Sequence, residues 1–174
     1  MTRLLRNMSL AATAAVVMVA ATPALAAPVA ASTPAQARAR IIKPLTLTVA
    51  GELNFGTIVM NGVTANRVLS LSNANVLDCA GGSTEVVCDN ATTVPTYTVT
   101  GTQGQTVQVN KTASSLTGSN GGSLSLTPTG PASVLLTNSG ATGNEFAIGG
   151  NITISAATLD GVYTGTVDVT VQYP

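Results

Sequence analysis

Hydrophobic and polar residues alternate along residues 161–173, which read GVYTGTVDVTVQY. Large side chains recur in phase at every second position, and they are Tyr163, Val167, Val169, Val171 and Tyr173. A period of two is typical of a β-strand that buries one face and leaves the other in water. These residues are therefore predicted to form a strand that starts after the turn signal Asp160-Gly161 and runs almost to the last residue.

Comparable short runs recur through the chain from residue 45 onward. Residues 45–49, 53–60, 67–72, 97–100, 107–110, 124–126, 134–137 and 146–154 carry strand patterns. The GTQG turn at 101–104 is expected to join two of them as a hairpin, and residues 73–94 are expected to form a long polar loop. About nine short strands with turn signals between them, and no helical pattern after residue 26, predict an all-β sandwich.

The first 26 residues have the pattern of an export signal. Arg3 and Arg6 precede an apolar run at residues 8–21, and Ala24-Leu25-Ala26 fits the rule for signal-peptidase cleavage. The apolar run is short for a membrane anchor, so we expect a cleaved signal-peptide helix at 1–26. The protein is then exported to the periplasm, the cell surface or the medium. Residues 27–40 are predicted to be a flexible arm rich in Ala and Pro, and residues 41–174 the domain.

Composition argues against an enzyme and against a nucleic-acid partner. The chain has no His and no Trp, and only 8% of its residues are charged. Without the leader it carries five basic and seven acidic residues, a net charge of about −2, which is too small to attract a polyanion. The acidic residues are scattered, so no set of nucleophile and base is expected, and no cofactor.

The two cysteines are Cys79 and Cys88, both in the exported part of the chain. A close, even pair in an exported protein predicts a disulfide that closes a loop. A zinc site is disfavoured because the chain has no His. Three carboxylates near the pair, Asp78, Glu85 and Asp89, lack the regular alternation of calcium ligands. We therefore expect a solvated loop without a metal.

Three short motifs give the chain a resemblance to a known family. They are L-N-F-G at residues 53–56, F-x-I-G-G at 146–150 and G-x-Y-x-G-x-V at 161–167, together with the terminal Tyr173. With these motifs the chain resembles the exported bacterial β proteins of the domain-of-unknown-function 4402 family. More distantly, it is similar to the spore coat protein U-type pilins of the archaic chaperone–usher class. The resemblance implies an immunoglobulin-like or pilin-like sandwich.

The pilin resemblance implies assembly by strand donation, in which a segment of one subunit completes the sheet of its neighbour. Residues 27–40 have few large apolar side chains, so residues 41–49, with Leu45, Leu47 and Val49, are the candidate donor. Residues 163–173 are the candidate groove. The partners would be copies of the chain or related subunits, with a periplasmic chaperone and an outer-membrane usher. In this reading the protein is a structural subunit of a surface filament.

A second hypothesis stays open. Leu45, Leu47 and Val49 serve equally well as the first strand of a complete domain. The protein would then be a self-contained secreted sandwich that binds a small ligand or a glycan through its loops. The two hypotheses differ in whether residues 41–49 pair within their own domain.

Overall fold

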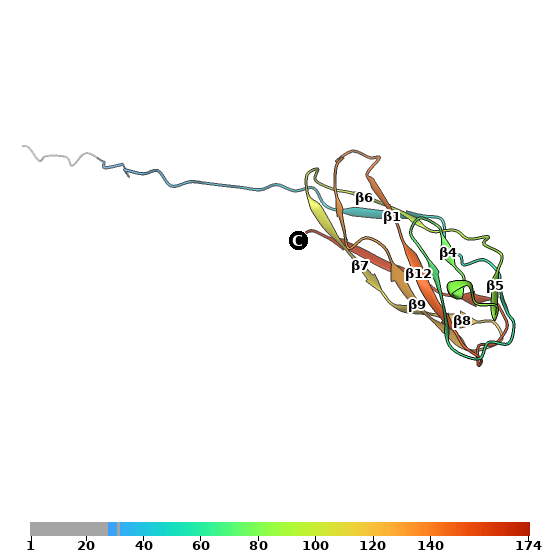
Figure 1. Ribbon diagram of the computed structural model, residues 1–174. Coiled ribbons are helices and arrows are strands. Elements are labelled where there is room, and N and C mark those ends of the chain that lie inside the picture. Colours follow the sequence, from blue (N-terminus) through green and yellow to red (C-terminus); the bar gives the residue numbers. More distant parts are fainter. Residues whose placement is uncertain (1–27, 31) are drawn as a thin grey trace, which may run out of the picture. The chain divides into compact units, whose positions relative to one another are not determined.

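The computed structural model describes residues 28–30 and 32–174, so the predicted leader at 1–26 lies outside the described residues. The chain divides into two units, Met1–Ala39 and Arg40–Pro174. In the first unit, the described residues form no helix or strand and are exposed. In the second unit, strands dominate, and the one helical element described is the short turn η1 (Ala80–Gly82) (Figure 1). The predicted all-β class is confirmed.

The strands form three sheets and one two-stranded ribbon, with antiparallel pairing throughout. The first sheet has the order β1 (Thr46–Ala50), β6 (Thr96–Thr100), β11 (Asn144–Ala147). The second has the order β10 (Ser133–Leu135), β7 (Thr106–Thr112), β14 (Asp168–Gln172). The third has the order β13 (Tyr163–Thr164), β8 (Ser114–Gly118), β9 (Ser123–Thr129), β12 (Gly149–Ile154), β3 (Arg67–Leu71), β4 (Leu77–Asp78). The ribbon pairs β2 (Ile58–Met60) with β5 (Val86–Cys88).

The described residues thus form fourteen strands where the sequence pattern predicted about nine. Part of the difference lies in the expected polar loop 73–94, which contains β4 and β5. Strand β8 (Ser114–Gly118) was not predicted at all. The other two additional strands come from interruptions that split the expected strands at 146–154 and 161–173. The closing strand is split into β13 and β14, because three residues, 165–167, face four residues, 113–116, on the opposite side. Residues 165–167 carry no strand pairing, and the chain passes there from the third sheet to the second.

The expected hairpin at 97–110 is not formed. β6 pairs with β1 and β11, whereas β7 pairs with β10 and β14, so the GTQG turn crosses from one sheet to another. The backbone groups at the end of the turn pair with Leu136 instead. The Gly104 N–H donates to the Leu136 carbonyl at 2.7 Å, and the Leu136 N–H donates to the Gln105 carbonyl at 2.8 Å. Two strands joined by a short turn have the same sequence pattern whether they pair in one sheet or belong to two sheets that pack against each other.

The first and last strands extend into two long edges. After β1, the pairing of the first edge continues through an isolated bridge between Asn54 and Thr93 and then through β2 with β5. On the last edge, β13 pairs with β8 and β14 pairs with β7. Within the described part of the chain, neither β1 nor β14 has a strand on its other side.

Two groups of buried apolar side chains form the core. Cluster 1 joins the third sheet to residues near β2 and β5, and it contains Phe55, Val63, Leu69, Leu71, Val86, Leu124, Leu126, Ile152 and Ile154. Cluster 2 joins the first sheet to the second, and it contains Tyr97, Val99, Val107, Val109, Leu136, Phe146 and Ile148. Val167 packs against both clusters. No helix in the described residues has the length and hydropathy needed to cross a membrane.

Candidate binding groove

The inward side chains of the two edges are less buried than those of the strands beside them. On β6 and β7, Val99 and Val107 are both 0% exposed. On β14, Val169 and Val171 are only half-buried, and on β1 Val49 is 57% exposed. All of these residues follow the same inward alternation, so the difference arises from the missing neighbour along each edge.

At one end the two edges are tied together by Tyr173. Its hydroxyl donates to the Lys43 carbonyl at 2.8 Å and accepts the Thr102 N–H at 2.8 Å. A Cβ on Gly101 would lie 2.6 Å from this hydroxyl, so only glycine leaves room for it. Leu45 and Leu47 pack into cluster 2 here, together with Val169, Val171 and Tyr173. We call this region the closed end.

Away from Tyr173 the two edges separate around a cavity of about 870 Å³. One rim runs along the first edge from Val49 to Met60, and the other runs from Thr158 to Val167. The floor is formed by Leu116, Leu124, Leu126, Ile152 and Ile154 from the third sheet. We call this cavity the groove and this region the open end.

The first rim owes its shape to the L-N-F-G motif. Asn54 exchanges two backbone hydrogen bonds with Thr93, and its side chain accepts the Gly56 N–H at 2.9 Å. Gly56 has a φ of +74°, and a Cβ there would overlap the Asp89 carboxylate. That carboxylate accepts the N–H groups of Ala91 and Thr57, and these hydrogen bonds hold the pKa of Asp89 below its ordinary value of 3.8. Between these polar anchors, Leu53 and Phe55 face the groove.

The second rim is formed by the G-x-Y-x-G-x-V motif. Gly161 has a φ of +143°, which favours glycine, and Tyr163 donates its hydroxyl to the Leu159 carbonyl at 2.8 Å. A Cβ on Gly165 would lie 2.8 Å from both a Leu116 methyl group and the Ser115 carbonyl, so the last edge approaches β8 closely at this point. Val167 completes the rim.

The third motif, F-x-I-G-G, lies behind the groove. Phe146 stacks on Tyr97 with ring centroids 5.5 Å apart, and Ile148 is fully buried. A Cβ on Gly149 would collide with the backbone of β3, and one on Gly150 would press on Leu126 and Leu53. Two glycines therefore allow β12 to carry the floor close to the first rim.

The residues singled out from the sequence divide between the two ends. Tyr163 and Val167 line the groove, whereas Val169, Val171 and Tyr173 pack at the closed end. The candidate donor segment forms strand β1 of its own sheet, with Thr46 to Ala50 in register with Thr100 to Thr96. Of its three apolar residues, Leu45 and Leu47 are packed at the closed end, and Val49 faces the groove.

Sequence reasoning missed most of the first rim and all of the floor as parts of a site. Leu53, Phe55, Ile58 and Met60 were interpreted only as strand residues, and the floor strands only as core. The signal available was the strand pattern on both sides of the L-N-F-G motif, which Gly51 interrupts. It does not reveal that the edge beside it is unpaired.

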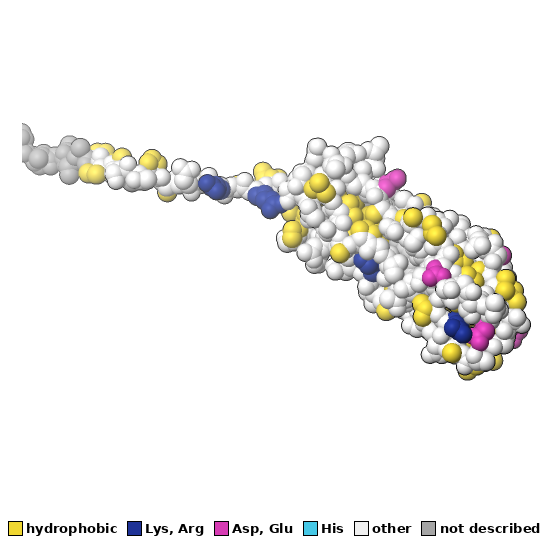
Figure 2. All heavy atoms as spheres, in the orientation of Figure 1, with side chains coloured by type: hydrophobic (Ala, Val, Ile, Leu, Met, Phe, Trp, Pro, Cys, Tyr) yellow, Lys and Arg dark blue, Asp and Glu magenta, His cyan; other side chains and the backbone are white. Residues whose placement is uncertain are grey.

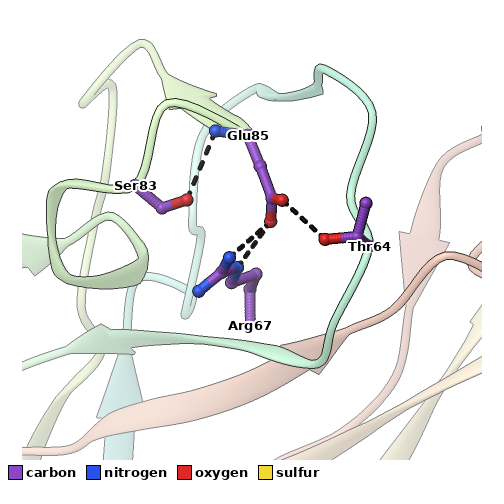
Figure 3. A network of polar contacts seen from close by, with 4 residues as sticks. All are labelled: Thr64, Arg67, Ser83 and Glu85. Atoms are coloured by element: carbon purple, nitrogen blue, oxygen red, sulfur yellow. Dashed lines mark hydrogen bonds and ion pairs between the residues drawn. The ribbon is translucent and has the colours of Figure 1, made fainter.

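The disulfide between Cys79 and Cys88 is confirmed, with Cα atoms 6.1 Å apart. Beside it, Glu85 accepts hydrogen bonds from the Thr64 hydroxyl at 2.7 Å and from Arg67, whose guanidinium lies 2.6 Å away (Figure 3). These hydrogen bonds hold the pKa of Glu85 below its ordinary value of 4.5, and the bond from Thr64 has the largest effect. The network joins β3 to the disulfide loop.

The other carboxylates of this loop do not converge on a common point. Asp78 accepts the Gly81 N–H at 2.8 Å, while Asp89 is held at the groove rim. Among the described residues, no group of three Asp, Glu, His or Cys side chains has the geometry of a metal site. The arrangement of this loop is that of a cross-linked surface loop.

Comparison with known proteins gives one match. Residues 45–173 match the family model described as "Domain of unknown function (DUF4402)". Neither the curated proteins nor the solved structures gave a match to this chain.

Proposed function

The family model covers most of the chain, so the protein belongs to the domain-of-unknown-function 4402 family, and we propose that it is an exported structural subunit that assembles into a surface filament by strand donation. The domain in this proposal is a pilin-like sandwich that lacks one strand. The observation that supports it is the groove between two unpaired edges, whose inward side chains stay half-exposed. A strand inserted there would pair with both edges and cover the floor.

The donor in this proposal is the exposed segment before Lys43, contributed by a second copy of the chain. β1 is a poor donor, because leaving its sheet would break its pairing with β6 and remove Leu45 and Leu47 from cluster 2. Lys43 is fixed to its own domain, since its N–H donates to the Thr102 hydroxyl at 2.6 Å and its carbonyl accepts from Tyr173. Residues 28–42 precede this anchor.

Burial of the rims gives a rough size for the driving force. Several apolar rim side chains remain partly exposed, and five of them are Val49, Leu53, Ile58, Tyr163 and Val167. Full burial of one such side chain is worth about 1.5–3 kcal/mol. Burying the half of the surface that these five still expose would therefore contribute on the order of 5 kcal/mol. This is comparable to the whole stability of a small domain, so the isolated subunit would be marginal and would favour association.

The proposal includes two further partners. A periplasmic chaperone would cover the groove before assembly, because exposed apolar grooves invite non-specific association. An outer-membrane usher would pass the subunits to the surface in order.

Deletion of residues 28–42 tests the proposal. The chain without its predicted leader should form polymers visible by electron microscopy and light scattering, whereas the deleted chain should stay monomeric with its disulfide intact. A chain with residues 28–42 moved behind Pro174 through a flexible linker should also stay monomeric and should melt at a higher temperature than the deleted chain. Two results together would show that the proposal is wrong. The undeleted chain would stay monomeric at high concentration and melt reversibly, and the chain with the moved segment would melt at the same temperature as the deleted chain.

Two observations favour a second function, that of a self-contained secreted protein that binds a small ligand or glycan. The first is that Thr46–Ala50 pairs with β6 of its own domain, as this hypothesis predicted and as strand donation by residues 41–49 did not. The second is the size of the cavity. The cavity volume lies in the range of about 300–1,000 Å³ typical of small-molecule sites. This function predicts that calorimetric titration with short glycans or apolar ligands gives saturable binding that deletion of residues 28–42 leaves unchanged.

A further inference from the structure

Charge divides the chain into a basic segment and an acidic domain. Residues 28–44 contain Arg38, Arg40 and Lys43 and no acidic residue. Residues 45–174 contain two basic and seven acidic residues, a net charge of −5. On the face drawn in Figure 2, charged side chains are few, and at one place a basic and an acidic side chain touch. With so few charges, the position of each one matters for which surfaces attract one another.

Within the basic segment, small apolar and polar residues alternate. Ala35, Ala37, Ala39 and Ile41 occupy one phase, and Gln36, Arg38 and Arg40 occupy the other. In an extended strand, the first set faces one side and the second set faces the opposite side. Residues 35–41 can therefore place an apolar face against a groove floor while both arginines face solvent.

Most of the groove floor has little surface left for an occupant to cover. Leu124, Leu126, Ile152 and Ile154 line it but are already 6%, 1%, 2% and 2% exposed, because neighbouring strands cover most of their surface. A strand with alanines can therefore cover the floor, and the few large apolar residues of the segment are no obstacle.

The rims of the groove are acidic. Glu52 lies on the first rim and Asp160 on the second, and both are exposed. Asp168 follows the second rim on β14 and lies near Tyr97, which lines the groove. The pKa of the Tyr97 phenol is raised, first by burial of the ring and second by the negative charge of Asp168. No ion pair holds these three carboxylates within the described residues.

The basic residues of the domain are engaged elsewhere. Arg67 is paired with Glu85. Lys111 donates its ammonium group to the carbonyls of Gly130 and Pro131 at 3.3 Å and 2.8 Å. The rims therefore keep a net negative charge that no cation of the same domain neutralises.

We propose that residues 35–41 of a second copy occupy the groove, with Arg38 and Arg40 lying between Glu52 on the first rim and Asp160 and Asp168 on and beside the second rim. This proposal rests on the proposed function. It adds that opposite charge selects the segment that enters the groove. Opposite charges attract the segment to the groove before its backbone pairs with the two edges. Attraction of this kind acts mainly on the association rate and is screened by salt over about 8–10 Å.

Charge reversal on each partner tests this pairing. One variant carries Arg38→Glu with Arg40→Glu, a second carries Glu52→Lys with Asp160→Lys, and a third combines all four. The matched control is Glu145→Lys, an exposed carboxylate on β11, at the far edge of its sheet from β1. Circular dichroism and melting temperature establish that each variant is folded.

Light scattering at low salt gives the rate of polymerisation. We expect the two double variants to assemble about tenfold more slowly than the unmodified chain, the fourfold variant to recover most of the rate, and the control to match the unmodified chain. Raising the salt to about 0.5 M should slow the unmodified chain and reduce these differences. Equal rates at every salt concentration would overturn the charge pairing and leave strand donation standing. Absence of polymerisation in the unmodified chain would overturn both.

A peptide assay tests the same pairing without polymerisation. A synthetic peptide of residues 28–42 is titrated into the domain that lacks these residues. We expect saturable binding that weakens about tenfold for the peptide with both arginines changed to Glu and recovers on the domain with Glu52→Lys and Asp160→Lys. Binding that ignores these changes contradicts the proposal.

Discussion

The same two edges of the domain meet at one end and separate at the other. At the closed end, Leu45, Leu47, Val169 and Val171 pack into one cluster, and the Tyr173 hydroxyl bonds to backbone groups near the first edge. At the open end, the rims flank a cavity of about 870 Å³. Direct packing without a middle strand is thus possible over part of the length, and over the remainder the two edges leave a cavity between them.

The closed end should carry most of the stability of the isolated domain. Leu136 is 0% exposed within cluster 2, so Leu136→Ala should cost about 2–5 kcal/mol through lost burial and a cavity. The matched variant at the open end is Leu53→Ala, which removes the same atoms from a half-buried rim. We expect a smaller loss of unfolding free energy there but a clear loss of assembly. Equal losses of stability in urea denaturation would contradict the distinction between the two ends.

The Tyr173 hydroxyl should determine where the closed end stops. Tyr173→Phe removes two hydrogen bonds, with an expected cost of about 1–3 kcal/mol, and should speed amide exchange at Thr102. Tyr163→Phe is the control, since the Tyr163 hydroxyl makes one bond, to the Leu159 carbonyl at the open end. If both variants leave the exchange of Thr102 unchanged, Tyr173 is not what ties the edges.

The sequence predicted the elements of the closed end better than the shape of the open end. Period-two alternation identified the inward residues of the last strand, because that pattern depends only on one face being buried. It also predicted the all-β class, and cysteine spacing predicted the disulfide. Pairing between strands distant in sequence was not predicted, since alternation carries no information about neighbours. Hence the sheet change between β6 and β7 and the unpaired first edge appeared only in the structure, whereas the groove along residues 163–173 was expected from the resemblance to pilins.

The open end should also be sensitive to added volume. Gly165→Ala would bring a methyl group within 2.8 Å of the Ser115 carbonyl, which cannot move without shifting β8. We expect a cost of about 1–2 kcal/mol and slower assembly, because the second rim is pushed toward the groove. Gly140→Ala is the control, since its Cβ would meet only the Asn138 side chain in an exposed loop. Normal assembly of the Gly165 variant would show that rim spacing does not limit entry of a strand.

Acid should loosen the open end before the closed end. Asp89 holds the first rim by accepting N–H groups from Ala91 and Thr57, and its pKa is lowered for that reason. A lowered pKa in the folded state means that this contribution is fully present above the ordinary value of 3.8 and is lost as the pH falls through the lower, folded value. At the closed end, Tyr173 bonds to backbone groups that do not titrate. When the pH is lowered from 6 to 3, the amide exchange rate of Thr57, corrected for its intrinsic rate, should therefore increase more than the corrected rate of Val99. Asp89→Asn, which keeps an acceptor oxygen but cannot titrate, should remove the change, and a pH response that survives this substitution would assign it to another group.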